Sequence, residues 1–352
     1  MPTADLRRYR VGVVQLSVAT NRRAENLARA EKLVRAAADD DCRLVVLPEV
    51  FATALNLPKS HEIAEPVPGP LTEWLAGLAR ELGVWIAAGV LERAGDDVHS
   101  TAVLLDDTGE LVGTARRTMV YDLEAHFITG RTGARVFPTP LGRIGFALGY
   151  DVQFPEVLRG LFADSAEIIV APSVLLRPFA EPVRQMLLAR AAENCAYVLF
   201  ASATGENTLA GLTYMGRSAI LRSPLAIGAY SRDFRKQQPV LAEADREEVL
   251  LTADLDLHEL RRMREAAPFA ADFRRSPLGL ALTAATHPDG PLPDWAAAAL
   301  PPHTAPHTAP HAASDTPDAP TPAAPDAPAA PDAPAAPDTS AAPDTSFASD
   351  GA

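Results

Sequence analysis

The sequence is poor in cysteine, with only Cys42 and Cys195 among its 352 residues. Two scattered cysteines form neither a disulfide framework nor the paired spacing of a thiolate metal site. A reducing cytoplasm is the usual setting of such a chain, and we expect that location. The first ten residues carry charges without an apolar core, so no signal peptide is visible, and no apolar run is long enough to span a membrane.

Positive charge is absent from the end of the chain. No lysine or arginine follows His303, whereas seven aspartates do, at positions 315, 318, 326, 332, 338, 344 and 350. They account for −7 of the formal net charge of −13 and leave −6 for the rest. A mildly acidic chain without a basic stripe is not suited to nucleic acid, so we expect no such partner.

Motifs that hold cofactors are also missing. No glycine-rich phosphate loop, metal-ligand spacing or flavin signature occurs, so we expect no cofactor and no metal. What the chain does have is apolar content. Hydrophobic residues make up 47% of it, which is enough to bury one large core or two small ones.

Apolar periodicity predicts helices and strands that alternate along the first three quarters of the chain. We expect strands near 11–16, 44–47, 84–91, 101–105, 111–115, 142–148, 168–171, 197–200, 218–221 and 249–255. We expect helices near 21–38, with Asn21 as its cap, and near 70–83, 155–162, 183–194 and 257–266. Alternation of this kind, interrupted by hairpins, indicates an α/β fold with a mixed sheet.

The last quarter of the sequence consists mainly of Ala, Pro, Thr and Asp. The tetrapeptide Ala-Ala-Pro-Asp recurs four times between residues 323 and 344. A segment so rich in proline and so poor in large apolar residues cannot bury a core. We therefore expect one domain over residues 1–275 and a disordered acidic tail over 276–352, which either keeps the chain dissolved or binds a partner.

The most informative stretch is 142–156, GRIGFALGYDVQFPE. Ile144 and Phe146 alternate with small residues as in a buried strand, and Pro155 suits the first turn of a helix. A strand, a sharp turn and a helix in succession expose one residue at the end of a sheet, where nucleophiles commonly lie. Here the residue at the turn is Gly149.

This stretch resembles the nucleophile turn of the carbon–nitrogen hydrolase (nitrilase/amidase) superfamily, whose pattern is Cys-Tyr-Asp-x-x-Phe-Pro-Glu. The matching residues are Tyr150, Asp151, Phe154, Pro155 and Glu156. Gly149 stands where the family has its cysteine. The resemblance extends over about residues 10–275 and implies the family fold, a four-layer α-β-β-α sandwich.

The resemblance also implies a Glu-Lys-Cys triad with a second glutamate nearby. Glu49, in Leu-Pro-Glu after a strand, matches the glutamate that acts as general base. Arg117 stands in place of the lysine, and Glu124 fits the second glutamate. Arginine still supplies a cation and hydrogen-bond donors, but it does not release a proton near neutral pH. Glycine has no side chain, so the covalent step of the family reaction cannot occur at residue 149.

Three further positions are candidates for ligand contact by the same resemblance. Tyr150 and Asp151 flank the turn, and Ser173 follows a strand where family members line the substrate pocket. Ser173 is also the one hydroxyl that we consider as a substitute nucleophile.

Three interpretations remain open. The first is a non-catalytic member that binds a small amide, carboxylate or acyl ligand. The second is an enzyme with altered, cysteine-independent chemistry on a C–N bond, in which Glu49 activates water and Arg117 stabilises the oxyanion. The third is a structural subunit of a homo-oligomer, since assembly is common in the family.

Overall fold

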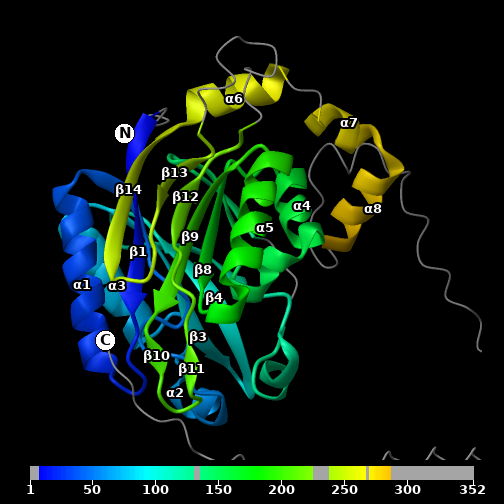
Figure 1. Ribbon diagram of the computed structural model, residues 1–352. Coiled ribbons are helices and arrows are strands. Elements are labelled where there is room, and N and C mark those ends of the chain that lie inside the picture. Colours follow the sequence, from blue (N-terminus) through cyan, green and yellow to red (C-terminus); the bar gives the residue numbers. More distant parts are fainter. Residues whose placement is uncertain (1–7, 131–134, 225–237, 267–268, 287–352) are drawn as a thin grey trace, which may run out of the picture. The chain divides into compact units, whose positions relative to one another are not determined.

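The computed structural model describes residues 8–130, 135–224, 238–266 and 269–286. Its main strands form two halves of one large sheet system, which meet where β1 (Arg8–Ser17) pairs briefly in parallel with β9 (Tyr197–Thr204). In Figure 1, helices α1 and α3 flank the strands on one side, and helices α4 and α5 flank them on the other.

The first half has the strand order β5-β4-β3-β2-β1-β14. Strands β1, β2 and β3 run parallel, and the other three pair antiparallel with their neighbours. Both faces of the parallel strands are buried, which explains their nearly continuous apolar sequences. The bounds of the added strands are β2 Cys42–Val46, β3 Trp85–Ala94, β4 Asp97–Leu105, β5 Leu111–Arg116 and β14 Val249–Asp256.

The second half has the order β6-β7-β8-β9-β12-β13, with β7, β8 and β9 parallel. A separate ribbon is formed by β10 and β11. The bounds are β6 Val136–Thr139, β7 Gly142–Phe146, β8 Ile168–Ser173, β10 Glu206–Asn207, β11 Leu212–Thr213, β12 Ala219–Leu221 and β13 Val240–Glu243.

Three apolar clusters separate the layers. One lies between the two sheets and includes Val11, Ile144 and Phe146. A second joins the first sheet to α1 (Arg23–Asp39) and α3 (Pro70–Leu82). A third joins the second sheet to α4 (Pro155–Ala163) and α5 (Ala180–Glu193). This arrangement confirms the predicted four-layer α-β-β-α sandwich.

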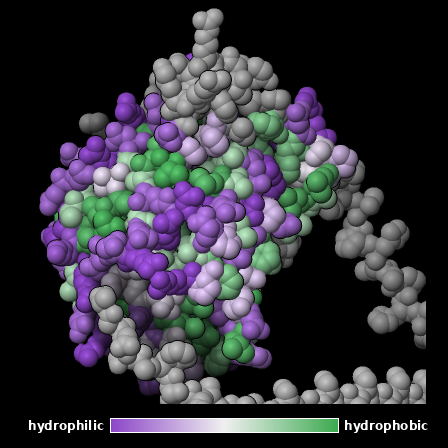
Figure 2. Space-filling view, in the orientation of Figure 1, coloured by the Kyte–Doolittle hydropathy of each residue, from purple (hydrophilic) through white to green (hydrophobic). Residues whose placement is uncertain are grey.

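Short helices connect and close these layers. They are η1 Leu57–Lys59, α2 Ser60–Ile63, η2 Asp122–His126, η3 Gly149–Gln153, η4 Arg177–Phe179, α6 Leu257–Ala266, α7 Phe269–Arg275 and α8 Pro277–Thr286. On the face shown in Figure 2, green hydrophobic residues form small patches between purple hydrophilic ones, the usual pattern of a surface in contact with water. No helix in the described ranges has the length and apolarity needed to cross a membrane.

Two sequence expectations need correction. Asn21 does not cap α1, because the helix begins at Arg23 and its cap residue makes no side-chain hydrogen bond. Helix α8 lies within the segment expected to be a disordered tail. Ser276 explains its start, since the Ser276 Oγ accepts the backbone N–H of Gly279 at 2.9 Å, and Pro277 occupies the first turn. The rest of the expected tail, 287–352, lies outside the described residues.

Candidate active site

The turn after β7 has the predicted form of strand, sharp turn and helix. Strand β7 ends at Phe146, η3 begins at Gly149, and α4 begins at Pro155. Gly149 is buried and has a φ of +45°, a conformation that glycine adopts without steric cost. The position matched to the family nucleophile is therefore a tight, left-handed turn without a side chain.

Three charged side chains from separate elements meet beside this turn. We call these three residues and Gly149 the Glu49 centre. Glu49 follows β2, Arg117 directly follows β5, and Glu124 lies in η2. Arg117 Nη1 donates to Glu49 Oε1 at 3.1 Å, and Arg117 Nη2 donates to Glu124 Oε2 at 2.6 Å. All three residues are buried: Glu49 is 1% exposed, Arg117 is 2% exposed and Glu124 is 9% exposed. The structure thus brings together the four positions that the sequence predicted.

The carboxylate of Glu49 lies against the turn. A Cβ added at residue 149 would come within 2.4 Å of Glu49 Oε2 and 3.4 Å of Arg117 Nη1. The space that a nucleophilic side chain would enter is therefore taken by a carboxylate oxygen. The other oxygen, Oε1, accepts a short hydrogen bond from Ser100 Oγ.

Burial controls the protonation of this centre. Loss of solvent raises the pKa of Glu49, and the effect outweighs the lowering by Arg117 and by the Ser100 hydrogen bond. Burial opposes the charge of Arg117, but the two nearby carboxylates of Glu49 and Glu124 more than compensate and raise its pKa. Arg117 is therefore a fixed cation, whereas burial favours the protonated form of Glu49.

Two atoms of the centre have no hydrogen-bond partner within the described part of the chain. They are Glu49 Oε2, an acceptor when ionised, and Arg117 Nε, a donor. Unsatisfied buried polar atoms are costly and rare, and both of these atoms belong to the same cluster. No group of three or more His, Cys, Asp or Glu side chains in the described ranges is placed to hold a metal.

Asp151, which we predicted to contact a ligand, has a different setting. It is fully buried and accepts the backbone N–H groups of Thr118, Met119 and Leu148 at 2.8–3.3 Å. It also pairs with Arg135 Nη1 at 3.2 Å. Because these donors engage both carboxylate oxygens, Asp151 braces the turn against the segment that follows Arg117. Its contact with a ligand stays a prediction.

The other two predicted contacts are Tyr150 and Ser173. The ring of Tyr150 stands edge-on to Tyr121, with centroids 5.2 Å apart, and to Phe154, with centroids 4.9 Å apart. Ser173 is fully buried at the end of β8, and its Oγ accepts the backbone N–H of Leu175 at 3.3 Å. This bond gives Ser173 a local structural role, and its proposed use as a nucleophile stays a prediction.

Sequence reasoning missed two residues that hold the site. Ser100 orients Glu49, and Arg135 pairs with Asp151. A signal for Ser100 was present, since three consecutive polar residues, 99–101, interrupt an apolar strand and are all buried. Arg135 had no such signal, because its role depends on a contact formed only in the fold.

Comparison with known proteins identifies the architecture. The family model described as Carbon-nitrogen hydrolase matches residues 10–265. A protein named nitrilase from Pyrococcus abyssi is 32% identical over 260 residues, which cover 72% of this chain and 92% of that protein. The omega-amidase NIT2 of Danio rerio is 27% identical over 279 residues, or 76% of this chain and 95% of the relative.

Solved structures share the fold. The Saccharomyces cerevisiae Nit3 structure gives a TM-score of 0.64 at 22% identity, covering 74% of this chain and 95% of Nit3. The C. elegans NitFhit protein gives 0.66 at 23% identity, covering 77% of this chain and 65% of that longer one. A mutant amidase from Nesterenkonia sp. AN1 gives 0.62 at 20% identity, covering 76% and 96%. In that amidase structure, the acetamide moiety of fluoroacetamide is added covalently at the active-site cysteine.

Proposed function

Because this chain belongs to the carbon–nitrogen hydrolase family, we propose that it binds the carboxamide group of a small molecule without forming a covalent intermediate at residue 149. Relatives named as a nitrilase and as omega-amidases support an amide, or a related acyl compound, as the ligand. The observation that carries the proposal is a pair of buried atoms of one cluster that have no partner among the described residues: Glu49 Oε2, which lies beside Gly149, and Arg117 Nε.

A carboxamide has the groups that these two atoms need. Its nitrogen donates a hydrogen bond to a carboxylate oxygen, and its carbonyl oxygen accepts one from a guanidinium N–H. A carboxylate ligand fits less well, because Glu49 and Glu124 already place two acids around the single cation of Arg117. We therefore expect the site to prefer an amide over the corresponding acid.

The missing side chain explains why binding would not lead to acyl transfer. The family reaction needs a thiolate that attacks the amide carbon. Gly149 has no side chain, and the group next to it is the Glu49 carboxylate. Cys42 and Cys195 are buried elsewhere, and burial raises the pKa of both thiols, to about 12 for Cys42. We propose that this member has lost the cysteine and lysine of the triad and retains the Glu49 centre as a binding site.

The raised pKa of Glu49 favours a second candidate function. A carboxylate with a raised pKa is a stronger general base near neutral pH. In this candidate, Glu49 removes a proton from water while the water oxygen attacks the amide carbon, and Arg117 stabilises the oxyanion. The proton then passes to the departing nitrogen as the C–N bond breaks, which releases ammonia and the free acid.

One experiment separates these candidates. We would titrate the purified full chain with butyramide and with butyrate by calorimetry and measure ammonia release in parallel. The first function predicts binding of butyramide, weaker binding of butyrate, and no ammonia above background. Glu49→Gln should weaken amide binding at least about tenfold, because it replaces the free acceptor with a mixed amide group. Glu62→Gln, at an exposed glutamate of α2, is the matched control.

The outcomes are distinct. Ammonia release that disappears in Glu49→Gln and persists in Glu62→Gln would establish the second function. Butyrate bound as tightly as butyramide would contradict the first function, which places the amide nitrogen on Glu49, whereas the second function places water there. Intact mass spectrometry after fluoroacetamide treatment should show no adduct, and an adduct would contradict the non-covalent proposal. Assembly into a homo-oligomer and a cytoplasmic location are further proposals from the sequence.

A further inference from the structure

Arg135 contacts both halves of the sheet system. It lies directly before β6, and its backbone O accepts the N–H of Phe146, at the end of β7, at 2.9 Å. Its side chain reaches the first half, where Nη2 donates to the backbone O of Arg116 at 2.9 Å. The other terminal nitrogen, Nη1, donates to Asp151 Oδ2 at 3.2 Å. Because Arg135 is only 8% exposed, one buried guanidinium joins the end of β5 to the turn after β7.

The groups that Arg135 holds lie on both sides of Arg117 in the chain. The carbonyl bonded to Nη2 belongs to the residue directly before Arg117. The two residues directly after it, Thr118 and Met119, donate their N–H groups to Asp151 Oδ1 at 3.0 and 2.8 Å. Since Asp151 is itself paired with Arg135, the hydrogen bonds before and after Arg117 lead to the same guanidinium.

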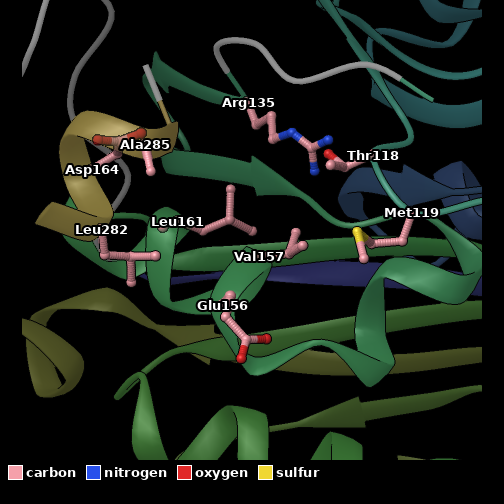
Figure 3. A pocket seen from close by; sticks show the side chains of 10 residues that line it. Thr118, Met119, Arg135, Glu156, Val157, Leu161, Asp164, Leu282 and Ala285 are labelled. Atoms are coloured by element: carbon pink, nitrogen blue, oxygen red, sulfur yellow. The ribbon is translucent and has the colours of Figure 1, made fainter. Parts of the chain in front are cut away.

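The segment 117–119 depends on such hydrogen bonds for its position. Strand β5 ends at Arg116, so the segment lies beyond the strand. Figure 3 shows Thr118 beside the guanidinium of Arg135, and both residues line a pocket of about 230 Å³ together with Met119. Because a cavity borders the segment, close packing from that side cannot fix it. Its backbone N–H and C=O groups are instead held by buried side chains.

Backbone direction decides where the long side chain of Arg117 points, because the allowed rotamers depend on the backbone angles. Its guanidinium must reach two acceptors from separate elements, Glu49 at 3.1 Å and Glu124 at 2.6 Å. A change of backbone angles at residue 117 would move it away from at least one of them.

We propose that Arg135 is a positioning residue of the Glu49 centre: it holds the backbone around Arg117 and so places the Arg117 guanidinium between Glu49 and Glu124. The consequence for ligand binding rests on the proposed function, whereas the effect on the ligand-free centre does not.

Arg135→Lys tests this role, because it keeps a positive charge beside Asp151 while one ammonium group does not reproduce a two-branched contact. The measurement is the pKa of Glu49 in the ligand-free full chain, followed through the ¹³C NMR signal of its carboxyl carbon and assigned with Glu49→Gln. Arg117 lowers this pKa, whereas Glu124 and Asp151 raise it. Displacement of the Arg117 guanidinium should therefore raise the pKa of Glu49 by about one unit.

Arg190→Lys is the matched control. Arg190 is also 8% exposed and holds the same turn, through the backbone O of Val152 at 3.2 Å and of Gln153 at 3.1 Å. Within the described part of the chain, none of its side-chain hydrogen bonds involves residues 116–119. The control thus disturbs the turn without the segment around Arg117, and it should leave the pKa of Glu49 unchanged.

Arg135→Met separates position from charge. It should raise the pKa of Glu49 further than Arg135→Lys does, because the negative charge of Asp151 then also loses its partner. The proposal is overturned if only Arg135→Met changes this pKa, since Arg135 would then act through its charge. It is also overturned if Arg190→Lys raises the pKa as much as Arg135→Lys does.

Ligand binding provides a second measurement. Arg135→Lys should weaken the binding of butyramide about threefold or more, because a displaced Arg117 no longer offers its donor in the same place. The pKa comparison needs no ligand. A failure of the unmodified chain to bind butyramide would therefore contradict the proposed function alone, and an unchanged pKa in Arg135→Lys would contradict the positioning role alone.

Discussion

Two buried acid–arginine groups, Glu49 with Arg117 and Asp151 with Arg135, lie near the turn at Gly149, and they differ in how completely their hydrogen bonds are satisfied. Asp151 receives three backbone N–H groups and an arginine. Glu49 receives Ser100 and Arg117 on one oxygen only, and its second oxygen has no partner among the described residues. Both carboxylates are almost completely buried.

The difference separates a structural role from a functional one. A buried carboxylate with every acceptor site engaged stabilises the fold, because its hydrogen bonds repay the cost of leaving water. When one oxygen of a buried carboxylate has no hydrogen bond, part of the desolvation free energy is not offset. A ligand that donates a hydrogen bond to this oxygen can offset it. The contrast predicts that Asp151 contributes mainly to stability and Glu49 mainly to binding.

The largest expected effect on the free energy of unfolding concerns Asp151, the carboxylate whose hydrogen bonds are satisfied. Asp151→Ala removes one member of a buried ion pair and leaves three N–H groups without an acceptor, so we expect it to lower the free energy of unfolding by about 3–5 kcal/mol. Glu49→Gln should cost about 1 kcal/mol or less, since Glu124 still pairs with Arg117 and excess buried negative charge is removed. Urea denaturation followed by circular dichroism measures both values.

The control for this prediction is Asp107→Ala. Asp107 forms an exposed ion pair with Arg43 at 3.4 Å, and its loss should cost less than about 1 kcal/mol. If Glu49→Gln destabilises the protein as much as Asp151→Ala does, the proposed division between the two carboxylates is wrong.

The sequence predicted the fold well where periodicity was strong. Strands buried on both faces, such as β1 and β8, were found because their apolar runs are nearly continuous. Strands β6 and β13 were missed, because they are short and only partly buried, so no alternation marks them. Helix α8 was missed because an Ala- and Pro-rich composition outweighed the local start signal of Ser276 and Pro277.

The candidate site was predictable only in part. Glu49, Arg117, Glu124 and Gly149 were identified by family resemblance, and the fold brings them together. No sequence pattern states that Glu49 Oε2 would lie in the space beside Gly149. That contact joins the end of β2 to the turn after β7 across the two sheets, and such pairings depend on the packed structure.

An intermediate effect tests the contact between the turn and Glu49. Gly149→Ala places a Cβ at a φ of +45° and 2.4 Å from Glu49 Oε2, so we expect a loss of about 2 kcal/mol. In a Glu49→Ala background the loss should fall by about 1 kcal/mol, because only the backbone strain remains. A double-mutant cycle in urea measures this coupling.

Gly83→Ala is the matched control for backbone strain. Gly83 has a φ of +65°, and a Cβ there would meet no atom within 4 Å. Its cost should be about 1 kcal/mol and should not depend on residue 49. Equal losses for Gly149→Ala with and without the Glu49 side chain would show that the carboxylate does not occupy the space beside the turn.

The smallest expected effect is the part of the pH dependence of the free energy of unfolding that arises from Glu49. Burial raises the pKa of this carboxyl above its ordinary value of 4.5. Below pH 4.5 the Glu49 carboxyl is protonated in both the folded and the unfolded protein. Its favourable contribution to the free energy of unfolding is then fully present. As the pH rises through the folded pKa, the unfolded chain ionises freely and this contribution is lost. The stability of Glu49→Gln relative to the unmodified protein should therefore increase over that range.

Urea denaturation of both proteins from about pH 4 to pH 8 measures this relative slope. Ser100→Ala sharpens the measurement, because the Ser100 hydrogen bond lowers the pKa of Glu49 and its removal should move the transition to higher pH. Parallel curves for the unmodified protein and Glu49→Gln would mean that Glu49 binds protons equally in the folded and unfolded states. The free Oε2 would then be solvated, and the distinction between Glu49 and Asp151 would no longer rest on burial.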